Sequence, residues 1–366
     1  MSSAVEIREA GLEDYPAIVA MLAHNGMTTK GREEWEHLWV NNPVYQKLSG
    51  WAIGWVAENP EREIVGYIGN IPLSFEFKGR EMIASCGHSL TMNTSHRGYA
   101  GFLLRRFLNY KTPELITATT ANTYTFKTLD ALRIPRVPAG DWGQAAFWIT
   151  NHRGFLASVL SKRGWPKQLS YPGSAVLSLR DKFTKRDSWV GQNHLEVQTC
   201  SSFDERFDRF WDELKHTYPQ RLLPTRSREV LQWHFKYPLE QGRAWIVTVG
   251  DGSRLRAYAI FRRRDVPEHQ LQRVQLVDFQ ALNNDPQILV AMLAWGLTLC
   301  RKEGIHMLEA FGFRPEKQAI IDGLAPYRRQ LPSWWYFYKP GNRSLGMELQ
   351  DATVWDPSHF DGDTSL

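Results

Sequence analysis

A polar loop of small residues separates an alternating apolar run from a helical apolar pattern. The run from residue 82 to residue 92 predicts a strand, and apolar residues at helical spacing after it predict a helix that begins near Gly101. The first amides of a helix have no partner within the helix, and the helix dipole adds positive potential there, so anions bind well at such a point. The loop therefore has the position of an anion site. A tight turn with a solvated arginine is the simpler alternative.

The composition of this loop suits a phosphate. Gly98, Ala100 and Gly101 have little bulk, so a phosphate can approach the backbone, and Arg97 adds a charged guanidinium. We therefore take the whole loop as a candidate phosphate-binding segment, which consists of Arg97, Gly98, Tyr99, Ala100, Gly101 and Phe102.

The strand before the loop carries a candidate general base. Histidine is largely neutral at cellular pH and can accept a proton, which makes His88 the best candidate. By the alternation of a strand, Cys86, His88 and Leu90 share one face. A histidine that is satisfied by its neighbours in the sheet remains the alternative for His88. Cys86 is better explained as a packed thiol than as a nucleophile.

Bulk properties exclude several classes of function. The chain has 366 residues, enough for two domains, and 44 Lys and Arg against 39 Asp and Glu give a net charge of +5. This charge suits an anionic ligand but falls short of a nucleic-acid signature. Three distant cysteines predict neither a disulfide framework nor a metal site. The sequence starts without a secretory pattern, and its longest apolar run, 288–300, is too short to span a membrane. We expect a cytoplasmic protein that binds neither nucleic acid nor membranes.

The predicted elements follow the same order twice. In the first half, strands and helices alternate as β-α-α-β-β-β-loop-α-β-α-β, with the last strand at 145–150. After a predicted helix at 151–163 and a Pro- and Gly-rich stretch with one strand-like run at 175–179, the second half repeats this order, from a strand at 195–197 to one at 334–338. The second copy lacks the small-residue loop. These patterns predict an α/β protein with two similar domains in tandem.

The loop and this order of elements resemble one known family. Arg97 to Phe102 resembles the Arg/Gln-x-x-Gly-x-Gly/Ala signature of the GNAT superfamily of N-acetyltransferases, with Ala100 where the family usually has Gly and Phe102 where it has Gly or Ala. The resemblance covers about residues 4–150. It implies an α/β fold with a mixed sheet in each of two GNAT-like domains. The expected divisions are an acetyl-CoA-binding domain at 1–150, a connecting segment at 151–191, a second domain without the loop at 192–350, and a tail at 351–366.

The resemblance also implies a reaction and a site. Acetyl-CoA would be the co-substrate, without a metal, and its acetyl group would pass to the amine of a small molecule by direct attack in a ternary complex. The tail sequences at 355–357 and 360–363 resemble those of GNAT-like proteins from polysaccharide gene clusters, which points to an amino sugar or a sugar nucleotide as acceptor. The pyrophosphate would lie on the loop, with Asn122 and the main chain of Leu90, Thr91 and Met92 on the pantetheine arm. His88 would be the base and Tyr124 a weaker candidate for the acid.

Two other functions stay open at this point. A Fem-type aminoacyl transferase would use charged tRNA, and would carry a long helical hairpin and no CoA loop. A non-catalytic GNAT-like binding protein would have lost the chemistry in both domains. The sequence does not indicate an oligomeric state.

Overall fold

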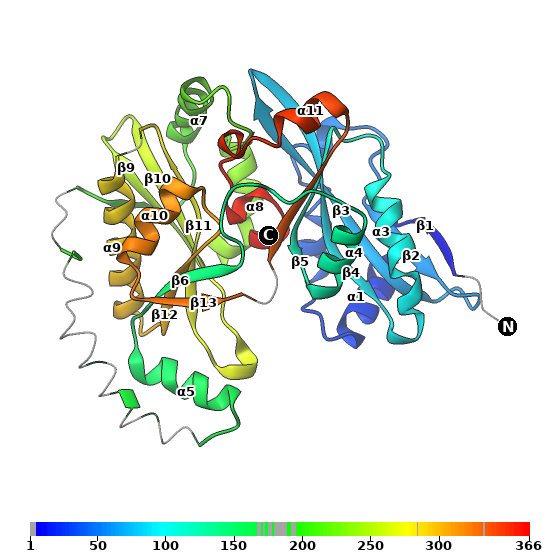
Figure 1. Ribbon diagram of the computed structural model, residues 1–366, viewed down its shortest axis with the longest axis horizontal. Helices are drawn as coiled ribbons and strands as arrows, with labels where there is room; N and C mark the ends of the chain where they lie inside the picture. The colour runs from blue at the N-terminus through cyan, green and yellow to red at the C-terminus, as the bar shows by residue number, and fades with distance from the viewer. Residues whose placement is uncertain are drawn as a thin grey trace.

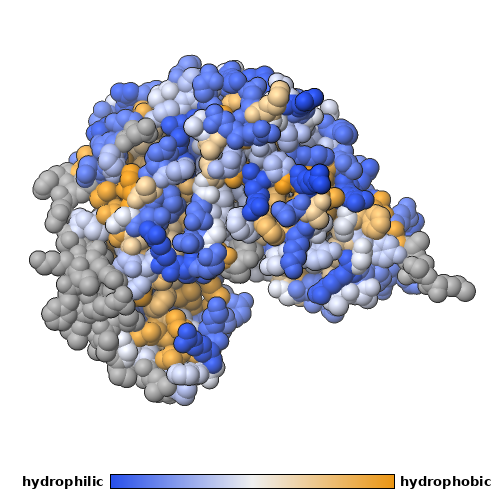
Figure 2. All heavy atoms as spheres, in the orientation of Figure 1, coloured by the Kyte–Doolittle hydropathy of each residue, from blue (hydrophilic) through white to orange (hydrophobic). Residues whose placement is uncertain are grey.

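The computed structural model describes residues 5–166, 170, 173–174, 178, 189–191, 195–283, 285–331 and 334–366. The chain forms two lobes, each built on a mixed sheet, and the C-terminus lies between them (Figure 1). Figure 2 shows the molecule hollowed between the lobes at the lower edge of the view. Helix α5 (His152–Lys162) lies at one end of the second lobe.

Sheet A has seven strands in the described part of the chain, in the order β1-β2-β3-β4-β5-β14, with β8 paired to the end of β3. Among the described strand pairs of this sheet, only β4–β5 is parallel. The strands of sheet A are β1 (Glu6–Glu9), β2 (Gly54–Glu58), β3 (Ile64–Phe77), β4 (Arg80–Met92), β5 (Leu115–Ala121), β8 (Leu223–Pro224) and β14 (Trp335–Pro340).

Sheet B also has seven strands among the described residues, in the order β13-β6-β12-β11-β10-β9-β7. Its parallel pair is β11–β12, which corresponds to β4–β5 of sheet A. The strands of sheet B are β6 (Gln144–Ile149), β7 (Gln198–Cys200), β9 (Ala244–Gly250), β10 (Leu255–Arg263), β11 (Arg273–Ala281), β12 (Met307–Ala310) and β13 (Tyr327–Gln330).

Helices cover both faces of each sheet. Period-two alternation sends Ala257 and Ala259 of β10 into one apolar cluster, with α9, and Tyr258 and Ile260 into another, with α7 and α8. On sheet A, α1 and α3 contribute to two different clusters in the same way. Besides α5, the α-helices are α1 (Tyr15–His24), α2 (Arg32–Glu36), α3 (Ala100–Leu108), α4 (Thr123–Ala131), α7 (Glu205–Thr217), α8 (Arg228–Glu240), α9 (Pro286–Lys302), α10 (Pro315–Leu324) and α11 (Arg343–Glu348).

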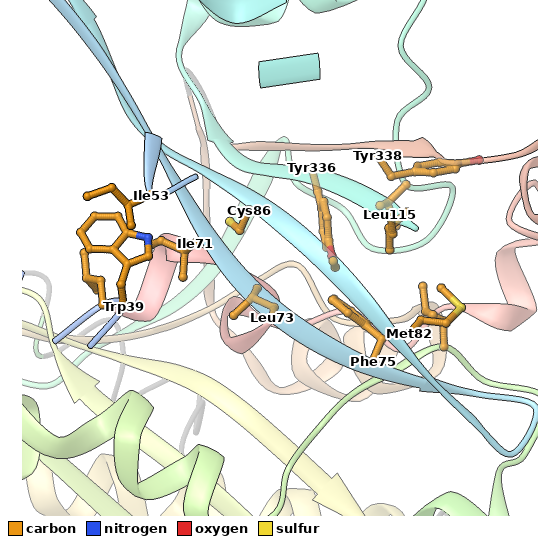
Figure 3. Packing of buried hydrophobic residues seen from close by; sticks show 14 of the residues in the cluster. Trp39, Ile53, Ile71, Leu73, Phe75, Met82, Cys86, Leu115, Tyr336 and Tyr338 are labelled. Carbon is orange, nitrogen blue, oxygen red and sulfur yellow. The ribbon is translucent and has the colours of Figure 1, made fainter. Parts of the chain in front are cut away.

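The core of sheet A reaches from β3 to the last strand of the chain. Ile71, Leu73 and Phe75 alternate along β3 and pack with Tyr336 and Tyr338 of β14 (Figure 3). All five side chains are at most 7% exposed. This apolar face is continuous across strands that lie about 260 residues apart in the sequence.

The strand pairing departs from the expected division at 150. We expected the strand near 145–150 to complete the first sheet, but β6 pairs with β12 and β13 in sheet B. Conversely, β14 comes from the second half of the chain but pairs with β5 in sheet A. The lobes therefore exchange their last strands. A local pattern marks a strand but not its partner, because pairing is decided by the surfaces that the strand buries on both faces.

Smaller differences concern element ends. The strand expected at 195–197 is β7, at Gln198–Cys200, and α8 includes Pro238. Pro238 lies in the last turn, where its missing N–H costs only one helical hydrogen bond. Before α3, residues Thr94–Tyr99 form a 3-10 helix instead of an open loop. Apart from Ser178, the run expected at 175–179 lies outside the described residues.

The tail from residue 351 folds back between the lobes. Its anchor is a buried ion pair between Arg226 and Asp278, with Nε–Oδ2 and Nη2–Oδ1 distances of 2.9 and 3.0 Å. Ser358 of the tail donates to Asp278 at 2.9 Å, and Asp361 lies 3.8 Å from Arg226. Asp278 is thus a buried carboxylate that is paired with Arg226.

Candidate functional site

Strands β4 and β5 are paired over only a short stretch. Their parallel ladder runs from Ala84 opposite Leu115 to Cys86 opposite Thr117 and then ends, although β4 continues to residue 92 and β5 to residue 121. Beyond Cys86 the two strands therefore leave a split in the middle of sheet A. Backbone groups at such a split are available to a ligand.

A cavity of about 770 Å³ opens at this split. Residues 87–90 of β4 and 118–122 at the end of β5 line one side, and the ends of β10 and β11 in the second lobe line the other. The tail contributes Asp363, Thr364 and Leu366. The cavity is thus shared by both lobes, and its volume is sufficient for a small-molecule ligand.

A β-bulge places two neighbouring side chains at the cavity. The register with β3 shifts between Tyr67 and Gly69, so β4 has one extra residue there, and Ser89 has a φ of 54°. We expected alternation to put Ser89 on the opposite face from His88. The bulge breaks the alternation, and both residues line the cavity. A serine at positive φ is strained, which is typical of functional sites.

His88 lies between two hydrogen-bonding partners. Its Nδ1 is 3.0 Å from Asp363 Oδ2, and its Nε2 is 2.9 Å from Ser89 Oγ. Asp363 also accepts hydrogen bonds from the hydroxyls of Thr119 and Thr120, at 2.8 and 3.1 Å. When Nδ1 carries the proton and donates it to Asp363, Nε2 is the acceptor that faces Ser89 and the cavity.

The predicted phosphate loop is at the start of α3 and is open to solvent. Arg97 is exposed and has no ion pair with any described residue. A Cβ atom built on Gly98 or Gly101 would meet nothing within 4 Å, so open space lies above the backbone at both. Phe102 is 58% exposed. This geometry fits an anion on the backbone, although none of the loop residues lines the cavity itself.

The predicted pantetheine-binding residues divide into two groups. Leu90 and Asn122 line the cavity, and the Asn122 side chain caps α4 by accepting from Thr125 N at 2.9 Å. Thr91 and Met92 lie just beyond the cavity on β4. The buried hydroxyl of Thr91 has no hydrogen-bond partner among the described residues, whereas Met92 is buried beside Gly66.

The structure does not bring Tyr124 to His88. Tyr124 is 54% exposed on α4 and does not line the cavity, whereas its neighbour Thr125 does. Burial raises the pKa of the Cys86 thiol well above its ordinary value, in agreement with a packed thiol. Sequence reasoning missed Ser89, Asp363 and the two threonines. The signal for Asp363 in the sequence was the resemblance of residues 360–363 to the tails of other GNAT-like proteins.

Two features are absent from the described residues. Their helices include none with the length and apolarity that a bilayer crossing requires. Their His, Cys, Asp and Glu side chains form no group of three that could hold a metal ion.

Comparison with known proteins shows which solved structures share the fold of this chain. No model of a protein family and no curated protein matches the sequence. A GCN5-related N-acetyltransferase from Anabaena variabilis matches with 12% identity and a TM-score of 0.52, over 93% of this chain and 73% of its own. N-myristoyltransferase from Saccharomyces cerevisiae, with bound myristoyl-CoA, matches with 11% identity and a TM-score of 0.57, over 93% and 79%. A probable N-acyltransferase from Enterococcus faecalis matches with 10% identity and a TM-score of 0.54, over 92% and 72%.

These likenesses extend over both lobes. The expected α/β class and the tandem GNAT-like arrangement are confirmed, and the chain has the fold of these N-acyltransferases. At 10–12% identity the likeness concerns the fold alone. The function has to be argued from the site.

Proposed function

We propose that the protein is an acyl-CoA-dependent N-acyltransferase. The observation that carries this proposal is the split between β4 and β5, which opens the backbone of sheet A beside a histidine oriented by a carboxylate. Of the structures with this fold, one is an N-myristoyltransferase with bound myristoyl-CoA, and another is described as a probable N-acyltransferase. The finer proposal is that acetyl-CoA is the co-substrate and that the acceptor is a small amine, such as an amino sugar.

The predicted loop and the split would hold different parts of acetyl-CoA. Arg97 and the open backbone at Gly98 and Gly101 would bind the pyrophosphate at the start of α3. The pantetheine arm would follow β4 into the split, past Leu90 and Asn122, which line the cavity. The thioester would then lie close to the bulge, where the irregular backbone offers an amide to the developing oxyanion.

His88 would be the general base. The amine nitrogen attacks the thioester carbonyl carbon, the C–N bond forms, the C–S bond breaks, and the proton of the amine passes to Nε2 of His88. Asp363 would fix the tautomer and stabilise the imidazolium, as its 3.0 Å contact with Nδ1 allows. The CoA thiolate then takes a proton from the imidazolium. The proposal assigns no step to Tyr124, because it does not line the cavity.

A second mechanism is favoured by one specific observation. Ser89, His88 and Asp363 form a continuous hydrogen-bonded chain in the order of a serine nucleophile, its base and the group that orients the base. In this mechanism Ser89 Oγ would take the acyl group first, and the amine or water would attack the resulting ester.

A transfer assay tests the proposed function. Purified protein is incubated with acetyl-CoA and a panel of amines that begins with amino sugars, and free thiol is measured over time. We expect amine-dependent release of CoA that falls in the Arg97→Ala variant. If neither wild type nor variant binds acetyl-CoA or releases thiol, the proposed function is wrong.

A further inference from the structure

The part of the cavity wall that comes from the second lobe is strongly cationic. At the start of β9, the end of β10 and the start of β11, five arginines line the cavity, together with Lys30 from the loop between α1 and α2. These arginines are Arg243, Arg262, Arg263, Arg264 and Arg273. The three consecutive arginines at 262–264 all line this cavity.

Half of these cations are neutralised by neighbouring carboxylates. Lys30 pairs with Glu34 at 2.5 Å, Arg263 with Asp265 at 2.8 Å, and Arg273 with the buried Glu309 at 3.2 Å. These pairs account for the acidic side chains on this wall. They also hold the strand ends in place around the remaining arginines.

Arg243, Arg262 and Arg264 have no ion pair with any carboxylate in the described part of the chain. Arg262 donates to the main-chain oxygen of Ser365, which is a neutral acceptor. Arg264 and Arg262 are half-buried, so water screens their charges only in part. Burial and the neighbouring arginines lower the pKa of Arg262 to about 9 and that of Arg264 to about 10.

The unpaired charges and the candidate base are connected through the tail. Ser365 contacts Arg262, and Asp363, two residues earlier, contacts His88. Asp363 also interacts electrostatically with Arg264. A ligand in the cavity can therefore contact the arginine wall with one end while its other end lies near His88.

We propose that Arg243, Arg262 and Arg264 form a binding site for an anionic group of the acceptor, so that the acceptor is an amine that carries a phosphate or a carboxylate. This inference rests on the proposed function, because it concerns the acceptor end of the same cavity. Guanidinium groups bind such anions through paired, charge-assisted hydrogen bonds. The CoA phosphates have a separate expected site at the start of α3, which does not line this cavity.

The test measures binding of matched probes without acetyl-CoA. Glucosamine 6-phosphate is compared with glucosamine, and β-alanine with β-alaninamide, by calorimetry at low salt. We expect the charged member of at least one pair to bind at least tenfold more tightly than its neutral partner. Arg264→Gln and Arg243→Gln should each remove at least tenfold of that affinity, and added salt should weaken it.

The control is Arg256→Gln, an exposed arginine on β10 that does not line the cavity, which should bind the probes like wild type. Equal binding of charged and neutral probes by wild type overturns the proposal, whether or not acetyl-CoA binds. If Arg264→Gln weakens acetyl-CoA as much as the charged probe, and CoA displaces that probe, the arginines hold CoA phosphates and the assignment to the acceptor is wrong. Failure of acetyl-CoA binding alone would contradict only the proposed function.

Discussion

His88 owes its geometry to residues from the far end of the chain. A histidine on a strand is common, but here Nδ1 meets a carboxylate 275 positions later, and the hydroxyls of Thr119 and Thr120 fix that carboxylate in turn. The bulge then brings Ser89 to the other ring nitrogen. Each contact limits the orientation of the imidazole, so the ring is held ready to accept a proton on the cavity side.

The first prediction concerns this histidine. His88→Gln keeps a polar side chain but removes the base, so we expect kcat to fall by about 10²- to 10⁴-fold with little change in acetyl-CoA affinity. Asp363→Asn should lower kcat less, because the imidazole remains. Steady-state kinetics with acetyl-CoA and an accepted amine measure both. His24→Gln, on the exposed surface of α1, is the control, and an unchanged kcat in His88→Gln would exclude the base.

Direct transfer and the acyl-serine mechanism differ in a covalent product. Under direct attack, intact-mass spectrometry of wild-type protein after incubation with acetyl-CoA should show no added acetyl group, and Ser89→Ala should retain most of the activity. A mass increase of one acetyl group that disappears in Ser89→Ala would establish Ser89 as the nucleophile.

At the scale of residues, some members of the candidate site could be predicted from the sequence alone. His88 could be proposed because its residue type and its strand were both visible locally, and the Arg97 loop because its small residues open a helix. Asp363 could not be proposed, because nothing local links an acidic tail to a particular strand. Ser89 was assigned to the wrong face, since alternation fails wherever a bulge adds a residue.

At the scale of elements, the split and the tail together make the cavity. The split exists because β4 and β5 stop pairing after Cys86 and Thr117. The short helix Asp363–Ser365 lies against both strands, so the tail closes one end of the split. The buried pair of Arg226 and Asp278 holds the tail in place through Ser358. A buried ion pair is costly to desolvate, and we infer that this pair serves to fix one conformation of the tail.

Asp361 in this network predicts a pH dependence of stability. Burial raises the pKa of Asp361 to about 8, against the opposing effect of Arg226, whereas an unfolded aspartate titrates near pH 4. Between about pH 4 and 8 the folded protein therefore binds more protons at this carboxyl than the unfolded chain. The contribution of Asp361 to the free energy of unfolding is full below pH 4 and is lost as the pH rises through about 8.

Thermal unfolding of Asp361→Asn against wild type measures this contribution. The amide does not titrate, so the Tm of wild type relative to the variant should decrease from pH 5 to pH 8. Parallel Tm profiles for the two proteins would show that Asp361 does not titrate in this range.

The elements themselves were largely visible in the sequence, because most strands and helices show clear period-two or helical patterns. The strand at 144–149 and the one at 335–340 were also recognised as strands. Their exchange between sheets was not, because it depends on which apolar faces meet in three dimensions. The short β13, Tyr327–Gln330, was missed, since its burial alternates weakly.

At the scale of the whole molecule, the exchange couples the two lobes. Sheet A is incomplete without β14, and sheet B is incomplete without β6, so neither half of the chain contains all the strands of one sheet. The tail adds buried contacts from Arg226 and Asp278 to the N-terminal strands through residues 358–363. The cavity therefore forms only when both lobes are folded.

A fragment test follows from this coupling. We expect residues 1–150 alone to lack a cooperative thermal transition, because the edge of β5 and the apolar side chains that pack on β14 would be exposed. Near-ultraviolet circular dichroism and calorimetry of the fragment measure this. The full chain is the reference and should unfold in one transition. A folded fragment with its own cooperative transition would contradict the coupling.

The central claim is that the split in sheet A binds an acyl-CoA. Calorimetry of the full-length protein with acetyl-CoA, CoA and longer acyl-CoAs tests it most directly, with Arg97→Ala as the matched variant. We expect one molecule of acetyl-CoA to bind per chain at micromolar concentration, and Arg97→Ala to bind at least tenfold more weakly because a charged contact to phosphate is lost. Preference for a longer chain would keep the claim and change the acyl group. Absence of binding for every acyl-CoA would contradict it.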